Sequence, residues 1–366
     1  MPPHTQRRRL RNAVAPVGAV LMATLLAACS GSAGGGASAQ DLKRVALMHV
    51  GTDHVPPSLG SLIGQLEQQY GWDLPQAEVD RCLEDNVAGK SKSCDLKGEK
   101  LELSWRNLEP EEAPVQADVF VREGVDVIVA FEDTSIKAAQ DATAGMSDPT
   151  PIVFLHPSDP IRDGLVKTLS RPDRNLTGVY GPRDVVAKQL ELYEALVPRL
   201  RRVLTLVDPQ DPSTERLLEQ YRGAAAQLPR PLRLVIRDAS SAQDLKRIFR
   251  SLRPGEVDGA FLLSPSLRLN HSALTIQLAK RAALPVQAHR KEWVEQGALY
   301  SYGIDLVPIG QAGARYVDNI LRGEKPADLP VQEVSTVDFS INLATAARLG
   351  IKVPQAMIVR ADEVYR

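Results

Sequence analysis

The chain has 366 residues, of which 43% are apolar and 24% are charged. These proportions fit a folded body, most simply two domains at about 150 residues each, and disfavour a disordered chain or one with many membrane spans. The formal net charge is −1, and because four arginines lie in the first 28 residues, the rest of the chain is more acidic still. This balance argues against a nucleic-acid partner, which needs a basic face.

The N-terminus predicts an export signal over residues 1–28. Four arginines, at positions 7, 8, 9 and 11, precede a mostly small and apolar run, Asn12–Leu25, that is too short for an ordinary spanning helix. The following Leu26-Ala-Ala-Cys29-Ser30 resembles a bacterial lipobox, so we expect Cys29 to be lipidated, although an ordinary secretory signal with a chance cysteine is the alternative. Residues 29–41 are rich in Gly, Ser and Ala and predict a flexible tether. The expected location is extracytoplasmic, as a membrane-anchored lipoprotein.

Two further cysteines, Cys82 and Cys94, stand twelve residues apart in a polar stretch. Outside the cytoplasm such a pair favours a disulfide, and we expect one here. Two free surface thiols and a metal-binding pair are the alternatives.

The first half alternates short apolar runs with segments of helical period, which is the pattern of βαβ units around a parallel sheet. Strands are predicted at 44–50, 100–105, 125–131, 152–155 and 176–180. Helices are predicted at 58–70, 113–123 and 134–145. Between Trp72 and Gly98 a charged stretch with both cysteines interrupts the rhythm, and it predicts an insertion.

The second half repeats the pattern. Its first helix follows Asp184 and runs through Val197. Strands are predicted at 202–207, 232–236, 259–263 and 285–287. Further helices are predicted at 213–227, 242–252, 272–283, 306–321 and 342–349. The body therefore contains two successive parallel-sheet patterns.

Several motifs in the middle and the C-terminal third of the chain occur in a recognisable order. They are Pro151–Phe154, Asp159-Pro160, Asn175–Val179, Leu190–Pro198, Ala298–Gly303, Ala314–Val331, Ile341–Gly350 and Arg360–Val364. Together they resemble the tryptophan/tyrosine-type substrate-binding proteins of ABC transporters, densely over residues 120–366 and more loosely over 43–70. The chain departs from that family at His49, at Phe131-Glu132-Asp133 and at His156, and its segment 72–103 is longer than the family's first crossover.

The resemblance implies an α/β fold of two Rossmann-like lobes with parallel sheets, joined by a three-crossover hinge, which is the type I periplasmic-binding-protein architecture. Lobe one would comprise residues 42–180 and 303–330, and lobe two residues 181–302 and 331–366. The implied function is that of a monomeric solute-binding protein that captures a small molecule, with an amino acid suggested, and delivers it to an ABC permease and its ATPase. A sensory lipoprotein, or a metal- or nucleoside-binding receptor of the same fold, is the alternative.

The search for catalytic motifs finds no GxSxG, GxxxxGK[ST], HExxH or CxxC, so we expect neither an enzyme nor a cofactor. In open parallel sheets, ligands bind beyond the carboxyl ends of strands, where helix N-termini offer free N–H groups. Thr134 and Ser135 could there receive a ligand carboxylate or simply cap a helix. Asp159 could pair with a ligand ammonium or form a turn before Pro160.

Other strand-end loops supply the remaining candidates. Ser264 and Ser266 could donate hydrogen bonds from lobe two, or be turn residues. Phe131, Trp293 and Tyr302 could wall an apolar ligand group, with core packing as the alternative for Phe131 and hinge bracing for Tyr302. Thr52, His156 and His289 complete the set of candidate ligand-binding residues.

A metal site among His49, His54, His156 and His289 can be imagined, but we expect none. Glu132 and Asp133 are candidate partners of a ligand amine, or solvated loop charges.

Overall fold

The computed structural model describes residues 42–51, 56–87, 90–181, 185–211 and 213–366. The predicted signal, Cys29 and the tether lie outside the described residues, and so do Thr52 and His54. Among the described helices, none has the length and apolar character needed to cross a membrane.

The first lobe is built on a seven-stranded sheet in the order β12-β6-β5-β4-β1-β3-β2. Its central strands, such as Val127–Phe131, are buried along their whole length, because helices cover both faces. Pairing is parallel except between β2 and β3. The strands are β1 (Lys43–Val50), β2 (Ser93–Lys97), β3 (Leu101–Leu108), β4 (Val127–Phe131), β5 (Ile152–Leu155), β6 (Leu176–Tyr180) and β12 (Gln332–Glu333).

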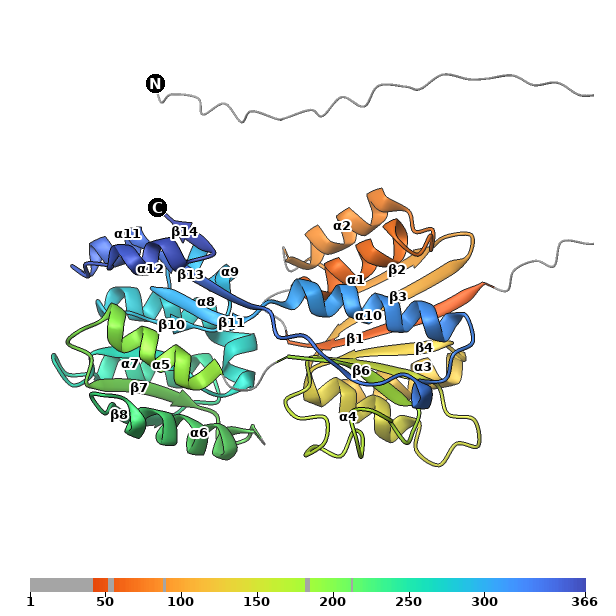
Figure 1. The fold of residues 1–366 in the computed structure, drawn as a ribbon, viewed down its shortest axis with the longest axis horizontal. Coiled ribbons are helices and arrows are strands. Elements are labelled where there is room, and N and C mark those ends of the chain that lie inside the picture. Colours follow the sequence, from red (N-terminus) through yellow and green to blue (C-terminus); the bar gives the residue numbers. More distant parts are fainter. Residues whose placement is uncertain (1–41, 52–55, 88–89, 182–184, 212) are drawn as a thin grey trace, which may run out of the picture. The chain divides into compact units, whose positions relative to one another are not determined.

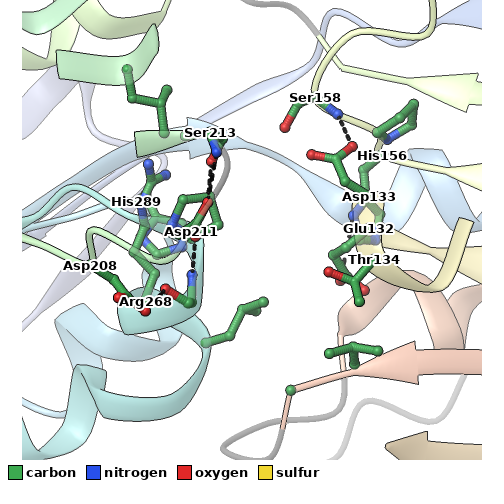
Figure 2. A pocket seen from close by; sticks show the side chains of 18 of the residues that line it. Glu132, Asp133, Thr134, His156, Ser158, Asp208, Asp211, Ser213, Arg268 and His289 are labelled. Carbon is green, nitrogen blue, oxygen red and sulfur yellow. Dashed lines mark hydrogen bonds and ion pairs between the residues drawn. The ribbon is translucent and has the colours of Figure 1, made fainter. Parts of the chain in front are cut away.

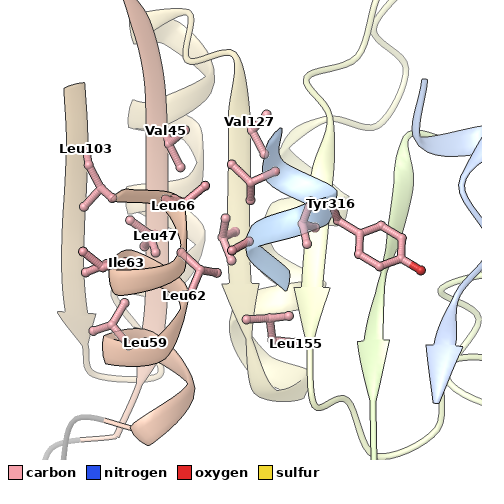
Figure 3. Close-up of a cluster of buried hydrophobic side chains, with 14 of the residues drawn as sticks. Val45, Leu47, Leu59, Leu62, Ile63, Leu66, Leu103, Val127, Leu155 and Tyr316 are labelled. Carbon is pink, nitrogen blue, oxygen red and sulfur yellow. The ribbon is translucent and has the colours of Figure 1, made fainter. Parts of the chain in front are cut away.

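Alternation along β1 divides its side chains between two cores. Val45 and Leu47 join the cluster under α1 (Pro57–Gln68) and α10 (Leu306–Leu321), which Figure 3 shows with the leucines of α1 lying on the strands. Ala46 and Met48 join the cluster under α3 (Ala113–Glu123) and α4 (Glu132–Ala142). This two-residue period is what a strand buried on both faces requires.

The insertion predicted between Trp72 and Gly98 contains α2 (Gln76–Val87) and the edge strand β2. A disulfide joins Cys82 of α2 to Cys94 of β2, with the sulfur atoms 2.04 Å apart and the Cα atoms 6.0 Å apart. The bridge attaches the added helix to the edge of the sheet.

The second lobe contains a parallel three-stranded sheet, β8-β7-β9, and a four-stranded sheet, β10-β11-β13-β14. A bridge between Ala260 and Val286 links the two sheets. The strands are β7 (Arg202–Val207), β8 (Arg233–Asp238), β9 (Gly259–Leu262), β10 (Gln287–Ala288), β11 (Tyr300–Ile304), β13 (Val337–Asn342) and β14 (Glu363–Tyr365).

Helices alternate with these strands as in the first lobe (Figure 1). They are α5 (Val185–Leu196), α6 (Thr214–Gln227), α7 (Ala242–Ser251), α8 (Pro265–Arg281), α9 (Lys291–Glu295), α11 (Leu343–Arg348) and α12 (Gln355–Arg360). A 3₁₀ turn, η1 (Pro326–Asp328), follows α10. The alternation of strands and helices in both halves confirms the predicted α/β fold with parallel sheets.

The chain passes between the lobes after β6, after β11 and after β12. Two of these passages touch, because a Cβ atom at Gly181 would lie 2.5 Å from Cδ1 of Ile304. The third passage begins later than the predicted boundary at residue 331, since Gln332 and Glu333 still pair with β6 of the first lobe. Figure 1 shows the chain running between the two lobes after β11 and again before β13.

Two predicted helices begin two or more residues earlier than expected, and both differences fall at the site. Helix α4 starts at Glu132 and not Thr134, so Glu132 lies in its first turn. Helix α8 starts at Pro265, seven residues before the predicted Ser272, because a proline is well suited to the first turn of a helix.

Candidate functional site

A cavity of about 580 Å³ is lined by residues from both lobes, and most of them follow strands or begin helices. Figure 2 shows the polar side chains from the two sides facing the space between them. Lobe one contributes Glu132, Asp133, Thr134, His156 and Ser158, and lobe two contributes Asp208, Asp211, Ser213, Ser266, Arg268, His289 and Arg290. A volume of this size suits a small organic molecule.

The lobe-one side of the cavity centres on Glu132. This residue follows β4 directly and has a φ of +57°, while His156 follows the neighbouring β5 with a φ of +43°. Residues other than glycine, asparagine and aspartate seldom adopt such backbone angles. The chain therefore holds two residues in an unfavourable backbone conformation at adjacent strand ends, and both of them line the cavity.

Two histidines flank the carboxyl group of Glu132. Its Oε1 lies 3.8 Å from Nε2 of His49 and 3.6 Å from Nδ1 of His156. His49 comes from β1 and is fully buried, and the other ring nitrogen of His156 lies 3.2 Å from the hydroxyl of Ser58. The ring of Phe131 packs against both imidazoles. Within the described part of the chain, neither carboxyl oxygen of Glu132 has a hydrogen-bond partner.

Burial dominates the protonation of this group. It raises the pKa of Glu132 to about 8; the positive charge of Arg290 opposes this rise, and the negative charge of Asp133 adds to it. Burial also lowers the pKa of His49 and of His156 to about 3, and the nearby Arg290 lowers both further. At neutral pH all three groups are mainly uncharged in the empty cavity, because a poorly hydrated environment disfavours their ionised forms.

The first turn of α4 places the neighbouring side chains differently. Thr134 is exposed on the cavity wall. Ser135 is buried, and its hydroxyl donates to the carbonyl of Phe131. The carboxylate of Asp133 accepts from the backbone N–H of Ser158 at 2.8 Å, which ties the loop after β5 to the helix. Thr134 is thus available to a ligand, whereas the hydroxyl of Ser135 is already bonded to the backbone at the start of the same helix.

In lobe two, the aspartates that line the cavity already accept hydrogen bonds from neighbouring residues. Asp208 accepts from the hydroxyl of Ser266 at 2.9 Å, and Asp211 accepts from the backbone N–H of Ser266, also at 2.9 Å. Ser264 is fully buried, and its hydroxyl accepts from the backbone N–H of Asp208 at 2.7 Å. Hydrogen bonds of this kind make Asp208 and Asp211 part of the loop scaffold.

Three arginines of lobe two also line the cavity: Arg216 of α6, Arg268 of α8 and Arg290 before α9. Arg268 donates through Nε to the carbonyl of Leu263 at 2.9 Å. The guanidinium of Arg290 lies 5.5 Å from the ring centroid of Trp293. Burial lowers the pKa of Arg268 and of Arg290, but arginines stay charged at neutral pH because their ordinary pKa lies above 12.

The structure brings four of the predicted ligand-binding residues to the cavity wall: Thr134, His156, Ser266 and His289. Ser135, Asp159, Ser264, Phe131, Trp293 and Tyr302 are not part of this lining. Phe131 and Trp293 are buried in hydrophobic cores, and Tyr302 packs on Phe339. Asp159 accepts from the backbone N–H of Arg162 at 2.8 Å, so it shapes its own turn. Thr52 lies outside the described residues.

Sequence reasoning missed Arg216 and Arg268, whereas Arg290 lies in the strand-end loop 289–293 that the sequence predicts to face a ligand. Arg216 and Arg268 lie within helices, where nothing in the local pattern separates them from solvated surface residues. Across the described ranges, no group of three or more His, Cys, Asp or Glu side chains has an arrangement that could hold a metal ion.

Comparison with known proteins decides the family. The model of the family described as ABC transporter substrate binding protein matches residues 92–365. The chain belongs to this family. Proteins of this family are the components of ABC transporters that bind small ligands. The two-lobed α/β body with its shared cavity agrees with that role.

Individual relatives agree in sequence and in fold. A tyrosine-binding protein of Clostridioides difficile (strain R20291) is 24% identical over 271 residues, which are 73% of this chain and 76% of that protein. A conserved domain protein from Vibrio cholerae has a TM-score of 0.71 at 26% identity, covering 88% of this chain and 100% of that one. An ABC domain from Streptococcus pneumonia in complex with L-Trp has a TM-score of 0.67 at 21% identity, with the same coverage of both chains.

Proposed function

We propose that this protein is a lipid-anchored extracytoplasmic receptor that binds an amino acid in the cavity between its lobes and delivers it to an ABC importer. The observation that carries the proposal is the cavity itself, because strand-end residues from both lobes line it. Family membership supports the transport role. The similarity to a tyrosine-binding protein and to a domain solved with L-Trp supports an amino acid as the ligand class.

The mechanism would be conformational and would involve no covalent step. A ligand that contacts both lobes lowers the free energy of a closed form relative to an open one, and the permease would recognise the closed surface. Thr134 stands beside the free N–H groups of the first turn of α4, so it is the proposed partner of the ligand carboxylate.

The anchor is proposed from the lipobox-like sequence that ends in Cys29. It is tested by whether Cys29→Ala abolishes palmitate incorporation in a bacterial host, and incorporation that persists would refute it.

The Cys82–Cys94 bridge is proposed to form after export, because oxidising compartments preserve such bonds. A peptide map of unreduced protein that shows the two cysteines in separate peptides would refute the bridge.

Thermal-shift titrations of the purified protein test the ligand class. The panel contains the twenty standard L-amino acids, nucleosides, sugars and divalent metals. Binding to the folded state alone raises the melting temperature by mass action, so we expect a saturable shift with at least one amino acid. Thr134→Ala should reduce that shift and leave the ligand-free melting temperature nearly unchanged, since this side chain is exposed. A shift that comes only from a metal, a sugar or a nucleoside would overturn the proposed ligand class.

A further inference from the structure

We propose that Glu132, enclosed by His49 and His156, is the subsite that receives the positively charged ammonium group of the ligand, and that it releases a proton when the ligand binds. This inference rests on the proposed amino-acid receptor function and names the residue that would select for the amine.

The first support is the backbone at these positions. Glu132 and His156 hold φ angles of +57° and +43° at neighbouring strand ends, and both line the cavity. Such conformations are energetically costly, and they persist mainly at functional sites. A residue whose only role was to begin α4 would not need this angle, because helix N-termini are satisfied by ordinary extended caps.

The second support is the set of unused acceptors. The side chain of Glu132 is 18% exposed, but both of its carboxyl oxygens are buried, and neither makes a hydrogen bond with a described residue. A buried carboxyl group without partners is costly. An ammonium group carries three donors and no acceptor, so it matches a site made of carboxylate oxygens and neutral imidazole nitrogens. Asp133 adds negative charge beside it.

The third support is the distribution of charge across the cavity. Among its described lining residues, lobe one contributes Glu111, Glu132 and Asp133 but no lysine or arginine. Lobe two contributes the three arginines and only two acids, Asp208 and Asp211, both of which accept hydrogen bonds from Ser266. Opposite walls of opposite sign orient a dipolar ligand, with its cationic group toward lobe one and its anionic groups toward lobe two or the N-terminus of α4. A zwitterionic amino acid satisfies both requirements.

Proton release follows from the groups that face Glu132. These are His49 from β1, His156 after β5, Asp133 of α4 and Arg290 from lobe two. In the empty cavity burial keeps the carboxyl group protonated up to about pH 8. An ammonium group binds the ionised form, so below pH 8 each bound ligand must displace the proton. Affinity should therefore weaken by about tenfold for each pH unit below 8, as long as the complex stays ionised.

The experiment compares two proteins with two ligands. Isothermal titration at pH 6, 7 and 8 is carried out with the strongest-binding of the twenty standard L-amino acids, and with the α-hydroxy acid that carries the same side chain. The wild-type protein is compared with Glu132→Gln, which preserves shape but cannot ionise. Glu123→Gln is the matched control, because it removes an exposed carboxylate at the end of α3, and Glu123 is not among the lining residues.

We expect Glu132→Gln to weaken amino-acid binding about 10- to 100-fold at pH 8, which is typical for the loss of a charge-assisted contact. It should also abolish the pH dependence and the proton release measured in buffers of different ionisation enthalpy. The wild-type protein should discriminate strongly against the hydroxy acid, and the variant should not. Glu123→Gln should behave as the wild type does.

The other outcomes separate this inference from the receptor function. If an amino acid binds the wild type and Glu132→Gln equally well, the subsite is wrong and the receptor function stands. If no amino acid binds the wild type, both fall. If Zn²⁺ or Ni²⁺ binds and only Glu132→Gln or His156→Asn abolishes it, the cluster is a metal site and the ammonium assignment is overturned.

Discussion

A carboxyl group and two imidazoles share one poorly hydrated space on the lobe-one side of the cavity, and burial works against the charged form of each. For an acid, burial raises the pKa, and for a base it lowers the pKa. The ligand-free protein should therefore lose stability in both directions of pH, for two separate reasons. Glu132 governs the alkaline side, and His49 and His156 govern the acidic side.

The signs follow from linkage. The folded-state pKa of Glu132, about 8, lies above its ordinary value of 4.5, so its contribution to stability is complete below pH 4.5 and is lost as pH rises through 8. The folded-state pKa values of the two histidines, about 3, lie below 6.5, so their contribution is complete above pH 6.5 and is lost as pH falls toward 3. Between pH 4.5 and 6.5 the two histidines gain more stability with rising pH than the single glutamate loses, so maximal stability of the ligand-free protein is expected near pH 6.5.

Urea unfolding from pH 4 to 8.5 checks this prediction. Glu132→Gln should make the ligand-free protein more stable than the wild type at pH 8, by roughly 1–4 kcal/mol, and should have little effect at pH 4.5. His156→Asn should reduce the acidic loss, and asparagine tolerates the positive φ at this position. Identical pH profiles for the wild type and Glu132→Gln would show that Glu132 ionises normally in the folded protein.

Between elements of lobe one, helices α1 and α10 approach each other closely. A Cβ atom at Gly310 of α10 would lie 2.0 Å from the carbonyl oxygen of Ser58 in α1 and 2.1 Å from the hydroxyl of Ser61. Ser61 also donates to the carbonyl of Val307 at 2.9 Å, which joins the two helices. The glycine is thus required by the distance between the helices.

Gly310→Ala should consequently destabilise the protein by about 1–3 kcal/mol, because overpacking forces the helices apart. Gly223→Ala is the matched control, since it lies in α6 with open space around it. That change should stabilise the protein by about 0.5–1 kcal/mol through helix propensity. Chemical denaturation of both variants measures the difference, and equal effects of the same sign would contradict this account of the α1–α10 contact.

The fold was largely predictable at this scale, whereas the site was only partly so. Strands such as β5 and β6 were predicted to the residue because they are short, apolar and buried on both faces. The edge strand β2 was not predicted, since only one of its five residues is buried and its pattern resembles a polar loop. Thr134 and His156 were found because they follow strands, whereas Arg216 and Arg268 reach the cavity through tertiary packing that no local pattern encodes.

At the scale of the whole molecule, two lobes with separate hydrophobic cores line one shared cavity. Each lobe has its own hydrophobic cores, and among the described residues only Ile304, at the hinge end of β11, packs from a lobe-two strand against a lobe-one core. Contact between the lobes is therefore not fixed by a common core, and relative motion of such lobes is the ordinary expectation. A ligand that bridges Glu132 and the arginines of lobe two would supply the missing attraction.

Small-angle scattering tests this coupling with the purified protein and its strongest-binding amino acid. Ligand should reduce the radius of gyration, because contacts to both walls favour the closed form. Glu132→Gln should show a clearly smaller reduction at the concentration that saturates the wild type, and should recover the full reduction at about 10 to 100 times that concentration, since the variant weakens binding without blocking closure. A radius that is unchanged at saturation in the wild type would mean that the ligand does not favour a closed form.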